Sequence, residues 1–302
     1  MIAPGTAHQG VQLGRVRSET RAGVRINLRG RTGRLLADAT GLAVFVVMVF
    51  PLYWMIATAF KPGRDILSLT PKWVPSPFTL QNFQDAIGRP YFFDDIKNSL
   101  LVVGGTVIIS LALAFLAAVA VARFGFRGRT AFIIMIIGVQ MVPLNALIIP
   151  LYLMLDQVGQ TDSLPGVIAV YLAVVLPFMI WTLRGFVANV PVELEEAAMI
   201  DGCTRVEAFL RVVFPLIGPG LVATAIFGFI QAWNEYIIAY VLLASPENQT
   251  LTVWLASFTT NHGPEWGPLM AAATLTGLPV VAFFLLLQRW LAGGLTAGAV
   301  KG

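Results

Sequence analysis

Six long apolar stretches are the feature that most constrains the fold of this 302-residue chain. A transmembrane helix needs roughly 20 apolar residues to cross a hydrocarbon core of about 30 Å. Backbone N–H and C=O groups in lipid must be satisfied within the chain, and the stretches lack the alternation of barrel strands. The sequence therefore predicts an all-α, polytopic membrane protein. The six expected transmembrane helices are Ala39–Phe60, Ser99–Ala122, Ala131–Leu153, Pro165–Phe186, Leu216–Ala239 and Leu269–Leu291.

Composition supports this class and excludes others. With 57% hydrophobic and 12% charged residues, the chain has more apolar surface than one soluble core would bury. The single cysteine, Cys203, excludes an intramolecular disulfide. His8 and His262 are too few for a multi-histidine cluster, so we expect no metal site.

Basic residues predict the orientation of the chain in the membrane. They gather on one side of the six expected helices, and the positive-inside rule assigns that side to the cytoplasm, together with both termini. The connections at 157–164 and 245–268, on the opposite side, contain no lysine or arginine. The basic residues are Arg15, Arg17, Arg21, Arg25, Arg29, Arg31 and Arg34 in the tail, Arg123, Arg127, Arg129, Arg184, Arg205 and Arg211 in the connections, and Arg289 and Lys301 near the end.

Four regions follow from these patterns. Residues 1–34 form a disordered basic cytoplasmic tail, whose arginines we expect to set orientation; attachment to anionic lipid headgroups is the alternative. Residues 35–95 contain the first transmembrane helix and an outer loop. Residues 96–292 contain the other five helices, with a charged loop at 190–215. Residues 293–302 form a cytoplasmic C-terminal tail.

The charged loop at 190–215 predicts two short helices outside the membrane. Pro191 suits the first turn of a helix, and the glutamates that follow it are favoured by the helix dipole. Asp201-Gly202 ends this first helix. One face carries residues that allow another surface to approach closely, namely Leu194, Ala197 and Ala198.

The second short helix should begin at Thr204, which forms a capping-box pattern with Glu207. We expect it to end at Pro215. Its apolar stripe comprises Val206, Phe209, Leu210, Val213 and Phe214. Neither helix reaches the roughly 12 residues needed for stability alone in water, so each must dock on the bundle or on a partner protein. An amphipathic cap on the bundle is the alternative to partner binding.

At this loop the sequence resembles a known family. Glu196-Ala197-Ala198, Gly202 and the ending Val212-Val213-Phe214-Pro215 resemble the conserved loop of permease subunits of binding-protein-dependent ATP-binding-cassette importers. Val212 and Phe214 stand where that loop usually has isoleucine and leucine. From about Leu36 onward the chain also resembles the carbohydrate branch of that family, the maltose-permease G type. The matching motifs are Asn98-Ser99-Leu100, Met141-Val142-Pro143, Ile149-Pro150-Leu151-Tyr152, Trp233-Asn234-Glu235-Tyr236 and residues 293–302.

The resemblance implies a MetI-like transmembrane core that forms half of a sugar translocation path in a bacterial or archaeal cytoplasmic membrane. Expected partners are a second permease, two ATPase subunits, an extracytoplasmic solute-binding protein, the sugar and membrane lipid, but not nucleic acid. The residues implied in ATPase coupling are Glu195, Glu196, Ala197, Ala198, Asp201, Gly202 and Phe209. His262, in the outer connection, is expected to lie where the solute-binding protein docks.

The sequence contains no G-x-x-x-x-G-K-[ST] phosphate-binding motif. We therefore expect this chain to be a transport subunit without enzymatic activity or a bound cofactor, while partner ATPases use ATP and Mg. A stand-alone secondary transporter, the alternative, should show midplane charges and repeat symmetry. A membrane-embedded enzyme should show a nucleophile–base set or metal ligands. Neither pattern is evident in the sequence.

Polar residues within the expected spans are candidates for the translocation path. Amide and carboxylate groups can bind sugar hydroxyls, and an indole face suits the apolar side of a pyranose. The candidates are Gln140, Asn145, Trp233, Asn234 and Glu235. For Glu235, a network that holds the fifth helix in register is an equal alternative. For Gln140 and Asn145, which flank Pro143, we favour hydrogen bonding between helices.

Overall fold

The computed structural model describes residues 31–299, with side chains from 33 to 290, so the expected tail at 1–34 lies almost wholly outside the described residues. Residues 1–51 and 52–302 form two compact units. The elements up to residue 157 are α1 (Arg31–Ala59), α2 (Gly63–Ile66), α3 (Gln81–Ile87), α4 (Phe92–Arg123), α5 (Arg129–Gln140) and α6 (Leu144–Gln157).

The second half of the described chain contains most of the short helices. Its elements are α7 (Leu164–Asn189), α8 (Val192–Ile200), α9 (Arg205–Ala208), the π turn η1 (Phe209–Val213), α10 (Phe214–Leu216), α11 (Gly218–Trp233), α12 (Ile237–Leu242), the 3₁₀ turn η2 (Pro246–Asn248), α13 (Leu251–Ala256), β1 (Thr259–Thr260), β2 (Gly263–Pro264) and α14 (Trp266–Ala299). The two strands form a small antiparallel hairpin that pairs Thr259 with Pro264.

The helices confirm the predicted all-α membrane architecture. Four are long and apolar enough to cross a membrane: α1, α4, α7 and α14. Two further pairs of bent helices, Arg129–Gln140 with Leu144–Gln157 and Arg205–Leu216 with Gly218–Trp233, raise the number of candidate spans among the described residues to six where each pair counts as one span. Because α14 reaches Ala299, most of the segment expected to be a tail at 293–302 continues the last helix.

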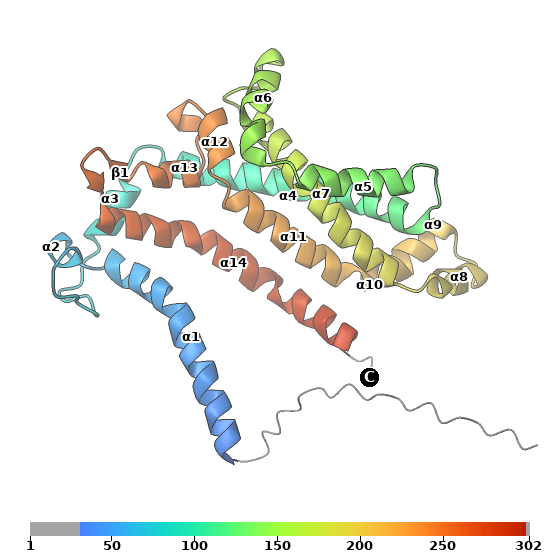
Figure 1. Cartoon of the computed structure of the whole chain (residues 1–302), viewed down its shortest axis with the longest axis horizontal. Coiled ribbons are helices and arrows are strands. Elements are labelled where there is room, and N and C mark those ends of the chain that lie inside the picture. The colour runs from blue at the N-terminus through green and yellow to red at the C-terminus, as the bar shows by residue number, and fades with distance from the viewer. Residues whose placement is uncertain (1–30, 300–302) are drawn as a thin grey trace, which may run out of the picture. The chain divides into compact units, whose positions relative to one another are not determined.

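The third and fifth spans differ from the straight helices expected at Ala131–Leu153 and Leu216–Ala239. In the third span α5 and α6 meet at 100°, with Pro143 as the N-cap of α6, because its ring cannot continue the hydrogen-bond ladder. The fifth expected span ends early, since α11 stops at Trp233 and α12 starts separately at Ile237. Figure 1 shows α6 turned away from the direction of α5.

The α4–α7 pair forms the centre of the second unit. One ridge of α4 carries small side chains at every fourth position, and all four are fully buried: Thr106, Ser110, Ala114 and Ala118. Small residues at such spacing let two helix backbones approach closely. Helices in a membrane associate through this kind of close packing, because lipid is itself apolar and the hydrophobic effect does not drive them together. On α7 the larger Val175, Met179 and Leu183 pack into the same cluster as Ala114 and Ala118.

Helices α11 and α14 pack through aromatic rings. Phe229 of α11 stacks on Phe283 of α14 at 4.0 Å between centroids, and on Trp233 at 5.4 Å.

Asn82 of α3 joins this helix to the end of α1. Its side-chain amide donates to the carbonyls of Ala59 and Lys61, each at 2.8 Å. Figure 1 shows α4 extending from the α13 and hairpin region to the α8–α9 region.

Ala114→Leu should lower the unfolding stability in detergent by about 1–3 kcal/mol, because the added atoms overpack the α4–α7 contact. Ala112→Leu on the exposed side of the same helix is the matched control and should leave stability nearly unchanged. Thermal unfolding of the two variants checks this. Equal melting temperatures would contradict the assigned packing face.

Candidate functional site

The loop between α7 and α11 begins with α8, whose ends follow the expected chemistry. Pro191 is the N-cap residue, one position before the helix, and Glu193 and Glu195 lie in the acidic first turn. At the other end Gly202 has φ +94°, the left-handed conformation that glycine adopts without strain. The N–H of Gly202 donates to Met199 O at 3.1 Å and that of Cys203 to Ala198 O at 3.0 Å, which together form a Schellman motif.

The second short helix begins as predicted and ends within one residue of the predicted end at Pro215. Thr204 Oγ1 accepts from the Glu207 N–H, and Glu207 Oε2 accepts from the Thr204 N–H at 2.8 Å, which completes the capping box. Hydrogen bonds lower the pKa of the Glu207 carboxyl: the bond from the Thr204 N–H has the larger effect, and the bond from the Thr204 hydroxyl has the next largest. A π turn over η1 lets the helical path continue through Pro215 to Leu216.

The residues predicted for coupling divide between two faces of the loop. Glu196, Ala197, Asp201 and Gly202 are exposed, and Ala198 is half-buried. Glu195 is buried and Phe209 is half-buried, so both face the bundle. The sequence did not predict that large apolar residues lie on the exposed side. Ile200 is 86% exposed, and Val206 and Leu210 of the expected apolar stripe also face outward.

The inner face of the loop packs on the last turns of α4. Phe115 lies between Phe209 and Phe214, at centroid distances of 5.8 and 5.6 Å. Val190 and Val213 are buried in the same cluster, against which Val119 and other α4 residues pack. This packing lets the short helices remain folded even though neither is long enough to be stable alone.

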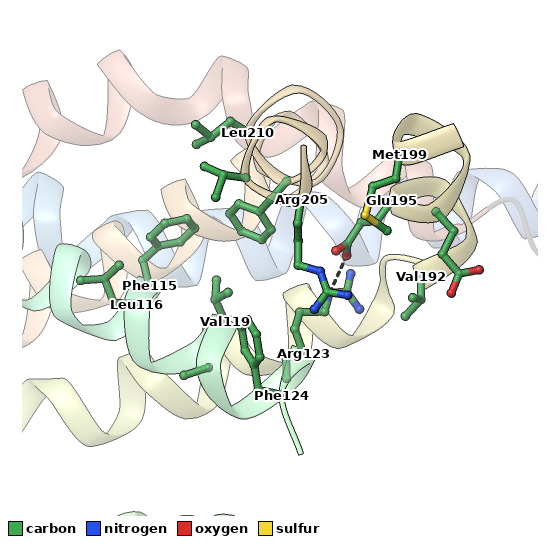
Figure 2. A pocket seen from close by; sticks show the side chains of 15 residues that line it. Phe115, Leu116, Val119, Arg123, Phe124, Val192, Glu195, Met199, Arg205 and Leu210 are labelled. Atoms are coloured by element: carbon green, nitrogen blue, oxygen red, sulfur yellow. Dashed lines mark ion pairs between the residues drawn. The ribbon is translucent and has the colours of Figure 1, made fainter. Parts of the chain in front are cut away.

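A groove of about 540 Å³ separates the end of α4 from α8 and α9. Figure 2 shows that Arg123 and Glu195 reach across it toward each other. Arg123 Nε lies 2.7 Å from Glu195 Oε1, and the two side chains are only 9% and 12% exposed. From the sequence, Arg123 is only one of the basic residues that predict orientation, because nothing in its local sequence pairs it with Glu195.

Among the path candidates, Glu235 is the centre of a hydrogen-bond network. Its carboxylate accepts from the Tyr171 hydroxyl at 2.8 Å and from the N–H groups of Ile238 and Ala239 at 2.9 and 3.1 Å. The Glu235 carbonyl accepts from Thr252 at 2.8 Å. These contacts link α7, α12 and α13. They favour the packing alternative for Glu235 that the sequence left open.

The other four path candidates have different environments. Trp233 is 7% exposed and stacks on Phe229, whereas Asn234 is exposed and donates to Ile230 O at 2.8 Å. Gln140 and Asn145 are exposed on either side of the α5–α6 break. Gln140 also lines a small cavity beside Trp181.

The connection between α13 and α14 contains the hairpin, with Asn261 and the exposed His262 at its turn. Its base is fixed by Arg89, which donates to Ser257 O at 3.0 Å and forms an ion pair with Glu265. The Arg89 guanidinium also lies over the Phe258 ring at 4.1 Å. The sequence does not predict this contact, because Arg89 and Glu265 lie 176 residues apart.

The bundle and its docked short helices define a polytopic membrane permease. Residues 110–296 match the family described as "Binding-protein-dependent transport system inner membrane component". The chain belongs to this family.

Related proteins support the assignment along most of the chain. The chain is 45% identical to the diacetylchitobiose uptake system permease protein DasC of Streptomyces coelicolor, covering 91% of this chain and 99% of that protein. It is 32% identical to the trehalose/maltose transport system permease protein MalG of Thermococcus litoralis, covering 89% and 97%. The fold matches a chain in the crystal structure of a bacterial ABC transporter involved in alginate import, with a TM-score of 0.71 at 21% identity over 86% of this chain and 98% of that one.

Glu235→Ala should lower unfolding stability by about 1–3 kcal/mol, because it leaves the buried Tyr171 hydroxyl without its acceptor. Asn234→Ala, at the exposed neighbouring position, should have little effect on stability. Thermal unfolding in detergent compares the two. A larger loss for Asn234→Ala would contradict the network.

Gly202→Val should destabilise the end of α8 by about 1–2 kcal/mol, because a branched side chain disfavours positive φ. Gly202→Asn is the milder control, since asparagine tolerates the left-handed region. Protease cleavage between residues 200 and 204 should accelerate in the valine variant and change little in the asparagine variant. Equal cleavage rates would show that the turn does not need this conformation.

Proposed function

We propose that this chain is the permease subunit of an ATP-driven sugar importer and forms half of its translocation path. A binding protein outside the cell delivers the sugar, as the family description and the names of the related sugar permeases support. The chain lies in the cytoplasmic membrane, and both termini and the α8–α10 end are cytoplasmic. The observation that carries the proposal is the exposed face of α8, which the bundle holds in place and leaves uncovered.

The exposed face of α8 is the contact for an ATPase subunit. Ala197 has a side chain small enough for close approach, Ile200 provides apolar surface, and Glu196 provides charge for a basic or polar group. ATP-driven closure of two ATPases moves α8, and the movement changes the bundle between inward-open and outward-open states. The ATPase must bind these two states with different affinity for coupling to occur.

The exposed amides contribute to the sugar path. Gln140, Asn145 and Asn234 each offer both donors and acceptors, which suits the hydroxyl groups of a carbohydrate. A second permease of similar fold supplies the other half of the path. ATP and Mg are bound by the ATPase subunits, and this chain binds neither. The hairpin with His262 lies on the outer side, where the solute-binding protein docks.

A tagged copy of this chain should retrieve a second permease and an ATPase from membranes. Glu196→Lys should abolish ATPase retrieval and sugar uptake without affecting membrane insertion, because it reverses the charge on the contact face. Arg127→Ala, at an exposed position in the α4–α5 connection, is the control and should retain both. Uptake at the wild-type rate by Glu196→Lys would contradict the assigned face. Ion-driven uptake by this chain alone would contradict the function.

A further inference from the structure

The ends of three helices meet at one guanidinium group. Arg123 is the last residue of α4, and its Nη2 donates to the carbonyl of Val190, the C-cap of α7, at 2.9 Å. Its Nε lies 2.7 Å from Glu195 Oε1, in the first turn of α8. The positive group therefore stands at the negative ends of two helix dipoles, and the carboxylate stands near the positive end of a third.

This ion pair crosses the groove that separates α8 from α4. The groove is lined on one side by Leu116 and Val119 of α4 and on the other by Met199 of α8, and Figure 2 shows the space between them. Apolar packing holds η1 and α10 against α4, but α8 faces α4 across this open space. The Arg123–Glu195 pair is thus a direct tie between α8 and the end of α4. Because both side chains are nearly buried, water screens the attraction only weakly.

Helix α4 continues from this tie to the far end of the bundle. Its 32 residues span about 48 Å at 1.5 Å per residue. Near its start, Asn98 donates to the carbonyls of Glu247 and Gln249 at 2.8 and 3.0 Å, and Ser99 Oγ accepts from the Leu251 N–H at 2.7 Å. A displacement applied to Arg123 is therefore carried by a continuous helix to the η2–α13 segment.

We propose that Arg123 and Glu195 are positioning residues that transmit the movement of α8 to α4 and through it to the η2–α13 segment. This inference rests on the proposed function and adds a route to it. Glu195 acts from the inner side of α8, whereas Glu196 acts on the outer side where the ATPase binds. The two neighbouring glutamates therefore have separable roles: one ties α8 to the bundle, and the other contacts the motor.

The test compares sugar uptake with ATP hydrolysis in proteoliposomes that contain the full complex and its binding protein. Glu195→Gln keeps the shape of the side chain and removes its charge. It should still retrieve the ATPase, but sugar imported per ATP hydrolysed should fall about tenfold, the size of a typical coupling free energy. Glu193→Gln, an exposed glutamate of the same helix, is the matched control and should keep the wild-type ratio.

Arg123→Lys provides an independent reading if the glutamine variant assembles poorly. Lysine keeps the charge but lacks the fork that contacts Val190 and Glu195 together, so the ratio should fall here as well. A wild-type ratio in an assembled Glu195→Gln or Arg123→Lys complex would overturn the inference, while loss of ATPase retrieval in Glu196→Lys would still support the proposed function. Failure of the wild-type chain to retrieve an ATPase would overturn both.

Discussion

Close packing of α4 on α7 is the contact on which the rest of the second unit depends. Thr106, Ser110, Ala114 and Ala118 leave room for the backbone of α7 to approach, and Met179 and Leu183 fill the space between the helices. Because the surrounding lipid is also apolar, the hydrophobic effect does not drive α4 and α7 together. Close packing and the dispersion attraction between their side chains hold the two helices in contact. Because α7 leads directly into α8 and α4 ends at Arg123, this contact also sets the position from which the docked loop begins.

Polar groups inside this apolar bundle serve mainly to join elements. Glu235 accepts hydrogen bonds from Tyr171 and from the start of α12, and so holds together the region where the fifth span breaks. Glu235 is half-buried, and withdrawing a carboxylate from water is expensive unless its oxygens are satisfied; here they accept three hydrogen bonds. The neighbouring Asn234 is exposed and donates to Ile230 O in the preceding turn, so adjacent positions differ in how they bind the bundle together.

The local features of this chain were readable from its sequence, whereas contacts between distant segments were not. Hydropathy predicted the candidate spans, and Thr204, Glu207 and Gly202 predicted how the short helices begin and end. The break at Pro143 was not predicted, because a proline can also bend a helix without ending it. Glu195 and Glu196 look alike in sequence. Successive residues of a helix point about 100° apart, so only the position of α4 decides which one meets Arg123.

The right-angle break between α5 and α6 has a consequence for hydration of the bundle. Met141 to Pro143 lie outside any helix at the break in the third expected span. The N–H groups of Met141 and Val142 donate to Gly138 O and Val139 O, but hydrocarbon cannot satisfy carbonyl groups that lose their helical partners at the break. They must therefore face protein or water. Water at this break has a consequence for a cell that maintains a voltage across its membrane, because a continuous chain of water molecules conducts protons. Helices α5 and α6, on either side of Pro143, must consequently never admit water from both compartments at once.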